Sequence, residues 1–230
     1  MGARPTVPRR GVVLRKNIVV SGALVAFFIA VVGLVAALSS TRGSEGAGSG
    51  TSEAAALVRA DSHRLDVAPD GGVTLVEFLD FECESCADAY PVVEEIRERY
   101  AGQITVVARY FPGDGHYNAQ NAAVAVEAAA RQGRFEDMYR RMYESQPQWG
   151  ERQSSEAPLF REFAVELGLD MAAYDAAVAD PATLARVLAD RDDGLALGVR
   201  GTPTFFLDGR ELTVSSAEEL LAAVDEAVRG

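Results

Sequence analysis

An α/β domain is the fold class that the sequence predicts, because strand-like and helix-like segments alternate along residues 70–230. Two segments rich in β-branched and aromatic residues, 73–79 and 103–111, flank a segment with helical periodicity. A long alanine-rich region with helical spacing follows, and then a hairpin and a last helix. This order predicts a βαβ unit and a ββα unit separated by a helical insertion.

Ahead of this domain, the N-terminal segment has the composition of a membrane anchor. Residues 1–42 carry six basic side chains and no acidic one, and residues 18–38 are 21 consecutive uncharged residues. At about 1.5 Å per residue this run spans roughly 30 Å, the thickness of the hydrocarbon core of a bilayer. We therefore expect residues 18–38 to form a single helix that spans the cell membrane, with residues 1–17 cytoplasmic and the rest of the chain extracytoplasmic.

A cleaved signal peptide is the alternative for the same segment, although the apolar core of such a peptide usually runs about 7 to 15 residues. Either outcome delivers the rest of the chain outside the cytoplasm. No cysteine lies near the end of the apolar run, which excludes lipid attachment there. Residues 39–52 are small, polar and rich in glycine, so we expect a flexible linker and lead-in over residues 39–69.

The charge of the chain excludes one class of partner. The full sequence has a net charge of −12, and because residues 1–42 contribute +6, residues 43–230 carry −18 from 16 basic and 34 acidic side chains. A body this acidic repels phosphate backbones, so we expect no nucleic-acid binding.

The first core strand leads directly into the two cysteines of the chain. Residues 73–79 (VTLVEFL) predict a strand, and apolar residues over 87–100 recur at helical spacing. Cys83 therefore falls where the strand turns into the helix. Pro91 removes one backbone donor inside that helix and predicts a kink.

The helical insertion covers about residues 116–197. Glycines and prolines divide it into helices near 118–131, 134–144, 158–167, 171–178 and 181–197.

The C-terminal unit begins with a hairpin over residues 202–212, in which Asp208-Gly209 supplies a two-residue turn. Ser216 is placed to cap a last helix that extends to Val228, and Glu219 follows at the spacing of a capping box. At the other end of the domain, residues 53–68 predict either a short helix or a lead-in strand.

Cys83 and Cys86 are the only cysteines in the sequence, and their spacing separates the possible roles. A disulfide that closes four residues constrains little of the unfolded chain, so a structural staple is a poor explanation. A zinc site needs about four ligands, whereas the chain adds only two histidines, His63 and His116. Two thiolates suffice for Cu(I), so a copper-binding module stays open beside thiol–disulfide exchange.

A helix N-terminus at Cys83 favours exchange chemistry. Unpaired N–H groups and the positive end of the helix dipole stabilise a thiolate there, whereas a free thiol has a pKa of about 8.5. Cys86 lies one turn further along the same face, as suits a buried resolving partner. The carboxylates of Glu82, Glu84 and Asp88 act in the opposite direction, because nearby negative charge raises the pKa of a thiol. We expect Glu82 and Glu84 to tune Cys83 in this way.

Three elements in this order resemble the DsbA-like thioredoxin-fold thiol:disulfide oxidoreductases. They are the Cys83-Glu84-Ser85-Cys86 motif at a strand-to-helix turn, the helical insertion after the second strand, and the segment GVRGTPTFFLDG over 198–209. The resemblance covers about residues 70–229 and implies a thioredoxin-like α/β fold, with a central mixed sheet flanked by helices. It also implies that Pro203 is a cis-proline packed against the sulfur pair. The backbone of Thr202 would then be free to pair with an extended substrate strand.

The resemblance implies a membrane-anchored protein disulfide oxidoreductase whose Cys83–Cys86 pair exchanges with the cysteines of secreted or membrane proteins. We expect it to act as an oxidant, without metal or organic cofactor, together with an unidentified redox partner protein that resets the pair. A reductase or isomerase of misformed disulfides, or a Cu(I)-binding metallochaperone-like module, is the alternative. His116 is expected to be a hydrogen-bonded surface histidine.

Overall fold

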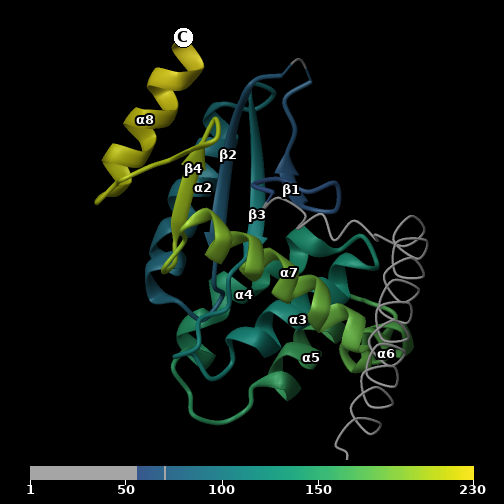
Figure 1. The fold of residues 1–230 in the computed structure, drawn as a ribbon. Coiled ribbons are helices and arrows are strands. Elements are labelled where there is room, and N and C mark those ends of the chain that lie inside the picture. Colours follow the sequence, from purple (N-terminus) through teal and green to yellow (C-terminus); the bar gives the residue numbers. More distant parts are fainter. Residues whose placement is uncertain (1–55, 70) are drawn as a thin grey trace, which may run out of the picture. The chain divides into compact units, whose positions relative to one another are not determined.

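The computed structural model describes residues 56–69 and 71–230 (Figure 1). The predicted cytoplasmic segment 1–17, the predicted transmembrane helix 18–38 and the first part of the linker, 39–55, lie outside these residues. Within the described ranges, no helix is both long enough and apolar enough to cross a bilayer.

Five strands form one mixed sheet in the order β1-β3-β2-β4-β5. Strand β2 pairs in parallel with β3 and antiparallel with β4. At the two edges, β1 pairs antiparallel with β3 and β5 pairs antiparallel with β4. The strands are β1 (His63–Asp66), β2 (Val73–Leu79), β3 (Ile104–Tyr110), β4 (Thr204–Leu207) and β5 (Arg210–Glu211). The predicted mixed sheet is thus confirmed, and the lead-in segment contains a strand rather than a helix.

Seven helices accompany this sheet in the described part of the chain. They are α2 (Glu84–Arg99), α3 (Ala119–Ala130), α4 (Phe135–Trp149), α5 (Ala157–Glu166), α6 (Met171–Ala179), α7 (Pro181–Leu197) and α8 (Ala217–Arg229). Helices α3 to α7 form the predicted insertion between β3 and β4, and α8 follows the hairpin.

Two details of the helices differ from the sequence prediction. The helix predicted for 134–144 is too short, because α4 continues through Pro147 to Trp149 and its last turn buries Gln146 and Trp149. The capping box forms only in part. Ser216 Oγ accepts a hydrogen bond from the Glu219 N–H at 3.2 Å, but the Glu219 carboxylate accepts from the N–H of Ser215 at 2.7 Å instead of Ser216.

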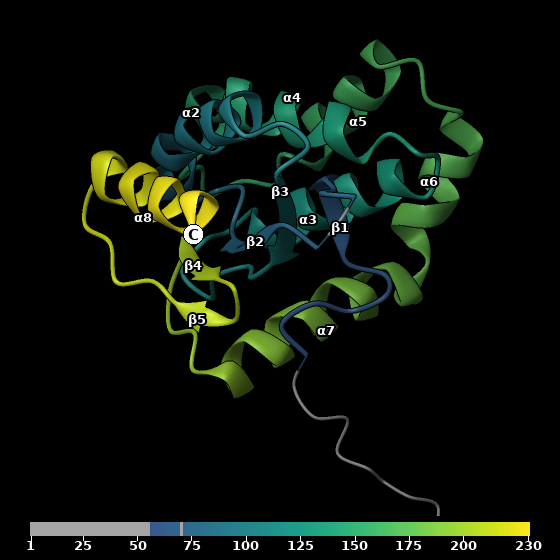
Figure 2. The same ribbon diagram turned by 90° about the horizontal axis from the view of Figure 1, so that it is seen from above.

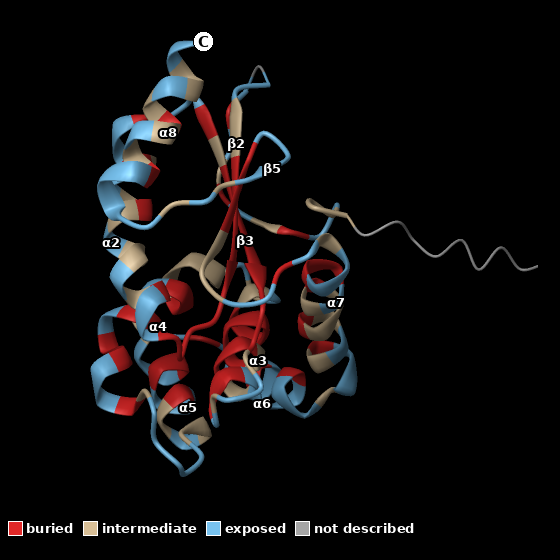
Figure 3. Cartoon of the chain, turned by 60° about the vertical axis from the view of Figure 1, so that its left-hand side comes forward, coloured by how far each residue is buried: buried red, intermediate tan, exposed pale blue. Residues whose placement is uncertain are grey.

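The two faces of the sheet are covered by different helices (Figure 2). Leu75 and Leu79 of β2 belong to the larger core, together with residues of α2, α3, α4 and α8. The alternate residues Val76 and Phe78 face a smaller core on the side of α7. Figure 3 shows the burial concentrated on the strands and on the inward sides of the helices. Helix α7 approaches closely at Gly194, where a Cβ atom would lie 2.8 Å from the Phe111 ring.

A buried ionic network joins β3, α7 and the first described residues. The Arg109 side chain is fully buried and forms ion pairs with Asp190 at 2.8 Å and with Asp193 at 2.6 Å. Its Nη1 also donates to the backbone oxygens of Ala56 at 2.8 Å and Leu57 at 2.6 Å. Because both carboxylates are almost completely shielded from water, each charge in this network depends on its partners.

Replacing Arg109 with leucine is expected to lower the free energy of unfolding by about 3 to 5 kcal/mol, because two buried carboxylates lose their fully buried cation and keep only the more exposed Arg186 and Arg59. Denaturant unfolding followed by circular dichroism measures this loss. Arg99→Ala is the control, since Arg99 pairs with Glu95 on the exposed surface of α2 and such pairs contribute at most about 1 kcal/mol. Equal losses in the two variants would contradict a structural role for the network.

Candidate active site

The turn from β2 into α2 carries the two cysteines. Cys83 is the N-cap residue of α2, with φ −70° and ψ 121°, and its carbonyl oxygen accepts from the N–H groups of Cys86 and Ala87 at 3.1 Å. Cys83 keeps 9% of its surface exposed, whereas Cys86 is completely buried. The structure therefore presents one sulfur to solvent and places the other beneath it. No disulfide joins the two cysteines in this structure.

A second segment meets the first cysteine from across the sheet. The Thr202-Pro203 peptide bond is cis, as the resemblance implied. The Cys83 thiol donates a hydrogen bond to the Thr202 carbonyl oxygen at 3.3 Å, although the two residues are 119 positions apart. The antiparallel pairing of β2 with β4 brings these segments together, since Phe78 lies opposite Thr204.

The surroundings of Cys83 favour its thiolate. Its pKa falls from the ordinary value of 9.0 to about 5. Hydrogen bonding from the Cys86 thiol is the largest cause, the Thr202 side chain and the backbone N–H groups of Ser85 and Cys86 add to it, and burial opposes it. The pKa of Cys86 is raised well above its ordinary value, chiefly by burial. At neutral pH the exposed sulfur is thus ionised and the buried one is protonated.

The two carboxylates predicted to tune Cys83 occupy different environments. Glu82 is buried, and one of its carboxylate oxygens accepts the backbone N–H of Asn118 at 2.6 Å. Burial is the main cause that raises its pKa. Glu84 is exposed at the first position of α2. The tuning role of this pair stays a prediction.

Glu77 is a buried acid that the sequence analysis did not single out. It lies in the middle of β2, on the face that packs against α2, and its exposed fraction is 2%. Burial and the negative charge of Cys83 raise its pKa to about 8. The negative charge of Glu77 in turn helps to raise the pKa of Cys86, so the ionisation of Glu77 and that of Cys86 are coupled. The single charged residue inside the strand VTLVEFL was the signal that could have identified it.

Gln146 is a second residue missed in the sequence. Its side-chain amide donates to the carbonyl oxygens of Cys83 at 2.9 Å and Phe81 at 3.3 Å, and so ties α4 to the cysteine loop. The contact depends on the last turn of α4, which the prediction had omitted.

No group of three or more His, Cys, Asp or Glu side chains suited to hold a metal ion occurs within the described residues. A site for zinc therefore has no support in this part of the chain. The absence of a metal or organic cofactor from the reaction stays a prediction.

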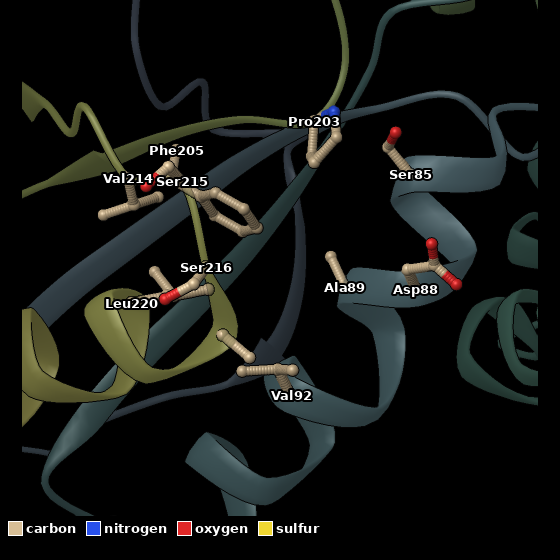
Figure 4. A pocket seen from close by; sticks show the side chains of 11 residues that line it. Ser85, Asp88, Ala89, Val92, Pro203, Phe205, Val214, Ser215, Ser216 and Leu220 are labelled. Atoms are coloured by element: carbon tan, nitrogen blue, oxygen red, sulfur yellow. The ribbon is translucent and has the colours of Figure 1, made fainter.

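A groove of about 410 Å³ opens beside Pro203, between α2 and the start of α8 (Figure 4). Ala89 and Val92 of α2 line one wall, and Phe205 and Leu220 lie across from them. Its polar lining comes from Ser85, Asp88, Ser215 and Ser216. The groove thus extends from the position next to the cysteines along an apolar floor with a polar rim.

The family model described as thioredoxin matches residues 68–226. The chain belongs to the thioredoxin family. Solved structures extend this finding. A thioredoxin-like oxidoreductase from Silicibacter pomeroyi is 25% identical with a TM-score of 0.63, and the match covers 76% of this chain and 97% of that one. The alpha-DsbA1 protein of Wolbachia pipientis is 19% identical with a TM-score of 0.64, over 75% and 93% of the two chains.

BdbD from Bacillus subtilis, in its oxidised form, is 21% identical with a TM-score of 0.62, and the match covers 74% of this chain and 94% of that one. The predicted thioredoxin-like fold is thus confirmed, and it is shared with the named DsbA protein and BdbD.

Curated relatives of this thioredoxin-family chain carry another name. The Na(+)/H(+) antiporter NhaA of Herminiimonas arsenicoxydans is 36% identical over 160 residues, and the match covers 70% of this chain and 24% of that protein. NhaA 3 of Salinispora tropica is 39% identical over 139 residues, which are 60% and 20% of the two chains. The chain thus spans about a quarter of the length of the curated relatives that it matches.

In this thioredoxin-family site, Cys86→Ala is expected to raise the pKa of Cys83, because the largest hydrogen bond to the thiolate is lost. In the reduced wild type, thiolate absorbance should appear with a midpoint near pH 5 and alkylation at pH 7 should modify Cys83 alone. Titration of the two proteins by ultraviolet absorbance tests this. The same midpoint in both would assign the acidity to the helix terminus instead of Cys86.

Glu77→Gln is expected to change the pH dependence of stability. In the folded protein the pKa of Glu77 is raised from 4.5 to about 8. Its contribution to the free energy of unfolding is therefore fully present below pH 4.5 and is lost as the pH rises through 8. Oxidised Glu77→Gln protein should therefore be more stable than wild type at pH 9, by about 2 to 5 kcal/mol, and similar to it at pH 4. Denaturant unfolding at both pH values measures this. Glu95→Gln on the exposed face of α2 should follow the wild type.

Proposed function

We propose that this protein catalyses thiol–disulfide exchange with cysteine-containing protein substrates, most simply as an oxidant that donates its Cys83–Cys86 disulfide. The observation that carries the proposal is the contrast between the two sulfurs. An acidic thiol that keeps 9% of its residue surface exposed, next to the cis-proline segment, is a good leaving group and nucleophile. A completely buried, protonated thiol within the same helical turn can close or open the disulfide.

In the donor direction, a substrate thiolate attacks the Cys83 sulfur of the oxidised pair. The Cys83–Cys86 bond breaks, a mixed disulfide forms, and the Cys86 sulfur leaves as a thiolate. A second substrate thiolate then attacks the substrate sulfur of the mixed disulfide and releases Cys83 as a thiolate. The substrate gains the disulfide and the protein gains two electrons. The low pKa of Cys83 favours this last release.

The proton that Cys86 must gain or lose needs a nearby group, because the sulfur has no exposed surface. Glu77 is suited to this, since its pKa of about 8 allows it to hold or accept a proton near neutral pH. In the reverse direction it would accept the proton of Cys86 when that thiol resolves a mixed disulfide.

The groove between α2 and α8 supports an extended peptide as the form in which substrate binds. It begins beside Pro203, and its apolar floor suits side chains next to the reacting cysteine. A peptide strand could also pair with the backbone of Thr202.

Placement outside the cytoplasm, tethered through residues 18–38, is part of the same proposal. The uncharged run and the basic residues before it support this placement. The matching relatives are named Na(+)/H(+) antiporters, which are proteins of membranes, so related segments occur in membrane proteins. An extracytoplasmic compartment is also where disulfides persist.

Equilibration of the full-length protein with glutathione buffers tests the function. A potential near −180 mV or above indicates a disulfide donor, and one near −270 mV indicates a reductant. Cys83→Ser should abolish exchange, whereas Glu95→Gln should keep it, because Glu95 lies on the exposed surface of α2 and does not line the groove.

Metal content is assayed on the same preparation. Stoichiometric copper on a protein with no exchange activity would replace this proposal by the Cu(I)-binding alternative, in which the two thiolates hold the ion.

A further inference from the structure

Asp80 lies directly after β2, and its carboxylate is fully buried beneath the cysteine loop. One carboxylate oxygen, Oδ1, accepts the N–H of Glu82 at 2.9 Å. The other, Oδ2, accepts the N–H of Gly113 at 2.8 Å and lies 2.6 Å from His116 Nδ1. The backbone oxygen of Asp80 accepts the N–H of Cys83 at 3.2 Å. One residue thus joins the cysteine loop to the loop that follows β3.

The packing around this pair is tight at Gly113. A Cβ atom there would lie 3.1 Å from Asp80 Oδ2 and 3.3 Å from His116 Nδ1. Both distances are shorter than ordinary van der Waals contacts, so a side chain at this position would require the carboxylate or the ring to shift by a few tenths of an ångström. The His116 ring is 35% exposed, so the pair also reaches solvent.

His116 carries a positive charge at neutral pH, and the negative charge of Asp80 balances it within the pair. The hydrogen bond to Asp80 is the main cause that raises the pKa of His116 to about 9, burial opposes it, and the negative charges of Asp80, Cys83 and Glu82 add to it. The attraction between His116 and Cys83 is mutual, so it favours the thiolate as well as the imidazolium. The acid Asp114 in the same loop is paired with Arg191 at 2.7 Å.

The residues between the cysteines, Glu84 and Ser85, supply no cation. We propose that His116, held by Asp80, supplies it from outside the motif. His116 is a positioning residue that stabilises the anionic Cys83 sulfur and thereby favours the dithiol form of Cys83 and Cys86. This inference rests on the proposed function, and it makes the protein a stronger oxidant than it would be with an uncharged side chain at position 116.

Replacing His116 with glutamine keeps a hydrogen-bond donor and removes the charge. The equilibrium is that of the oxidised pair with two glutathione thiols, which gives the Cys83/Cys86 dithiol and glutathione disulfide. His116→Gln should shift this equilibrium roughly 3- to 10-fold toward the protein disulfide and lower the thiolate-to-thiol ratio of Cys83 by a similar factor. His116→Lys should restore much of both.

His63→Gln is the matched control, because it removes the other histidine, whose Nε2 lies 2.7 Å from Glu127. It should leave the thiolate titration and the glutathione equilibrium unchanged. The inference would be overturned if His116→Gln had the same thiolate titration and glutathione equilibrium as the wild type. It would also be overturned if His63→Gln changed them as much as His116→Gln does. A wild type with an acidic Cys83 that depends on His116, yet with no exchange activity, would refute only the proposed function.

The same inference can be tested on the wild-type protein, without relying on a variant that must fold. Titration of the two histidine rings by NMR should give His116 a higher pKa in the reduced protein than in the oxidised protein, since only the reduced form contains the thiolate. The His63 ring serves as the internal reference in the same spectra. A His116 titration that does not depend on the redox state would overturn the inference.

Discussion

The antiparallel pairing of β2 with β4 is the constraint on which the active site depends, because it brings the Cys83 sulfur to 3.3 Å from the Thr202 carbonyl oxygen. Strand β2 ends just before the first of these residues and β4 begins just after the second, so their pairing fixes both partners. A slip of one residue would turn the alternate side chains of β4 to the other face of the sheet and move Thr202 away. The insertion of five helices leaves this register intact, because it packs beside the sheet without separating β2 from β4.

Local signals in the sequence were sufficient for the parts of the site that lie next to one another along the chain. The strand-to-helix turn at Cys83 and the segment around Pro203 each have a short pattern, and only their combination identified the family. Glu77, Gln146 and Asp80 lacked such patterns. Their roles arise from burial and from contacts with residues far away in the sequence. Gln146 contacts a residue 63 positions away, and Asp80 contacts one 36 positions away. No helical or strand periodicity encodes such separations along the sequence.

The fold itself was largely predictable, because glycine, proline and apolar periodicity mark the ends of most elements. The helix α4 shows where this reasoning failed. Pro147 suggested a stop, yet the buried side chains of the last turn hold the helix together past it, so tertiary packing overrode the local signal. The environment of the acids near the cysteines was equally hidden, since a spacing in sequence does not tell which carboxylate is buried and which faces water.

The attachment of residues 56 and 57 to Arg109 has a mechanical meaning. Their carbonyl oxygens are held by a guanidinium that is itself anchored in β3 and α7, on the side of the sheet away from α2. Any force applied to the chain ahead of residue 56 therefore reaches β3 and α7 through this arginine, before it loads the edge strand β1. The cysteine loop, on the other face, is left outside that force path.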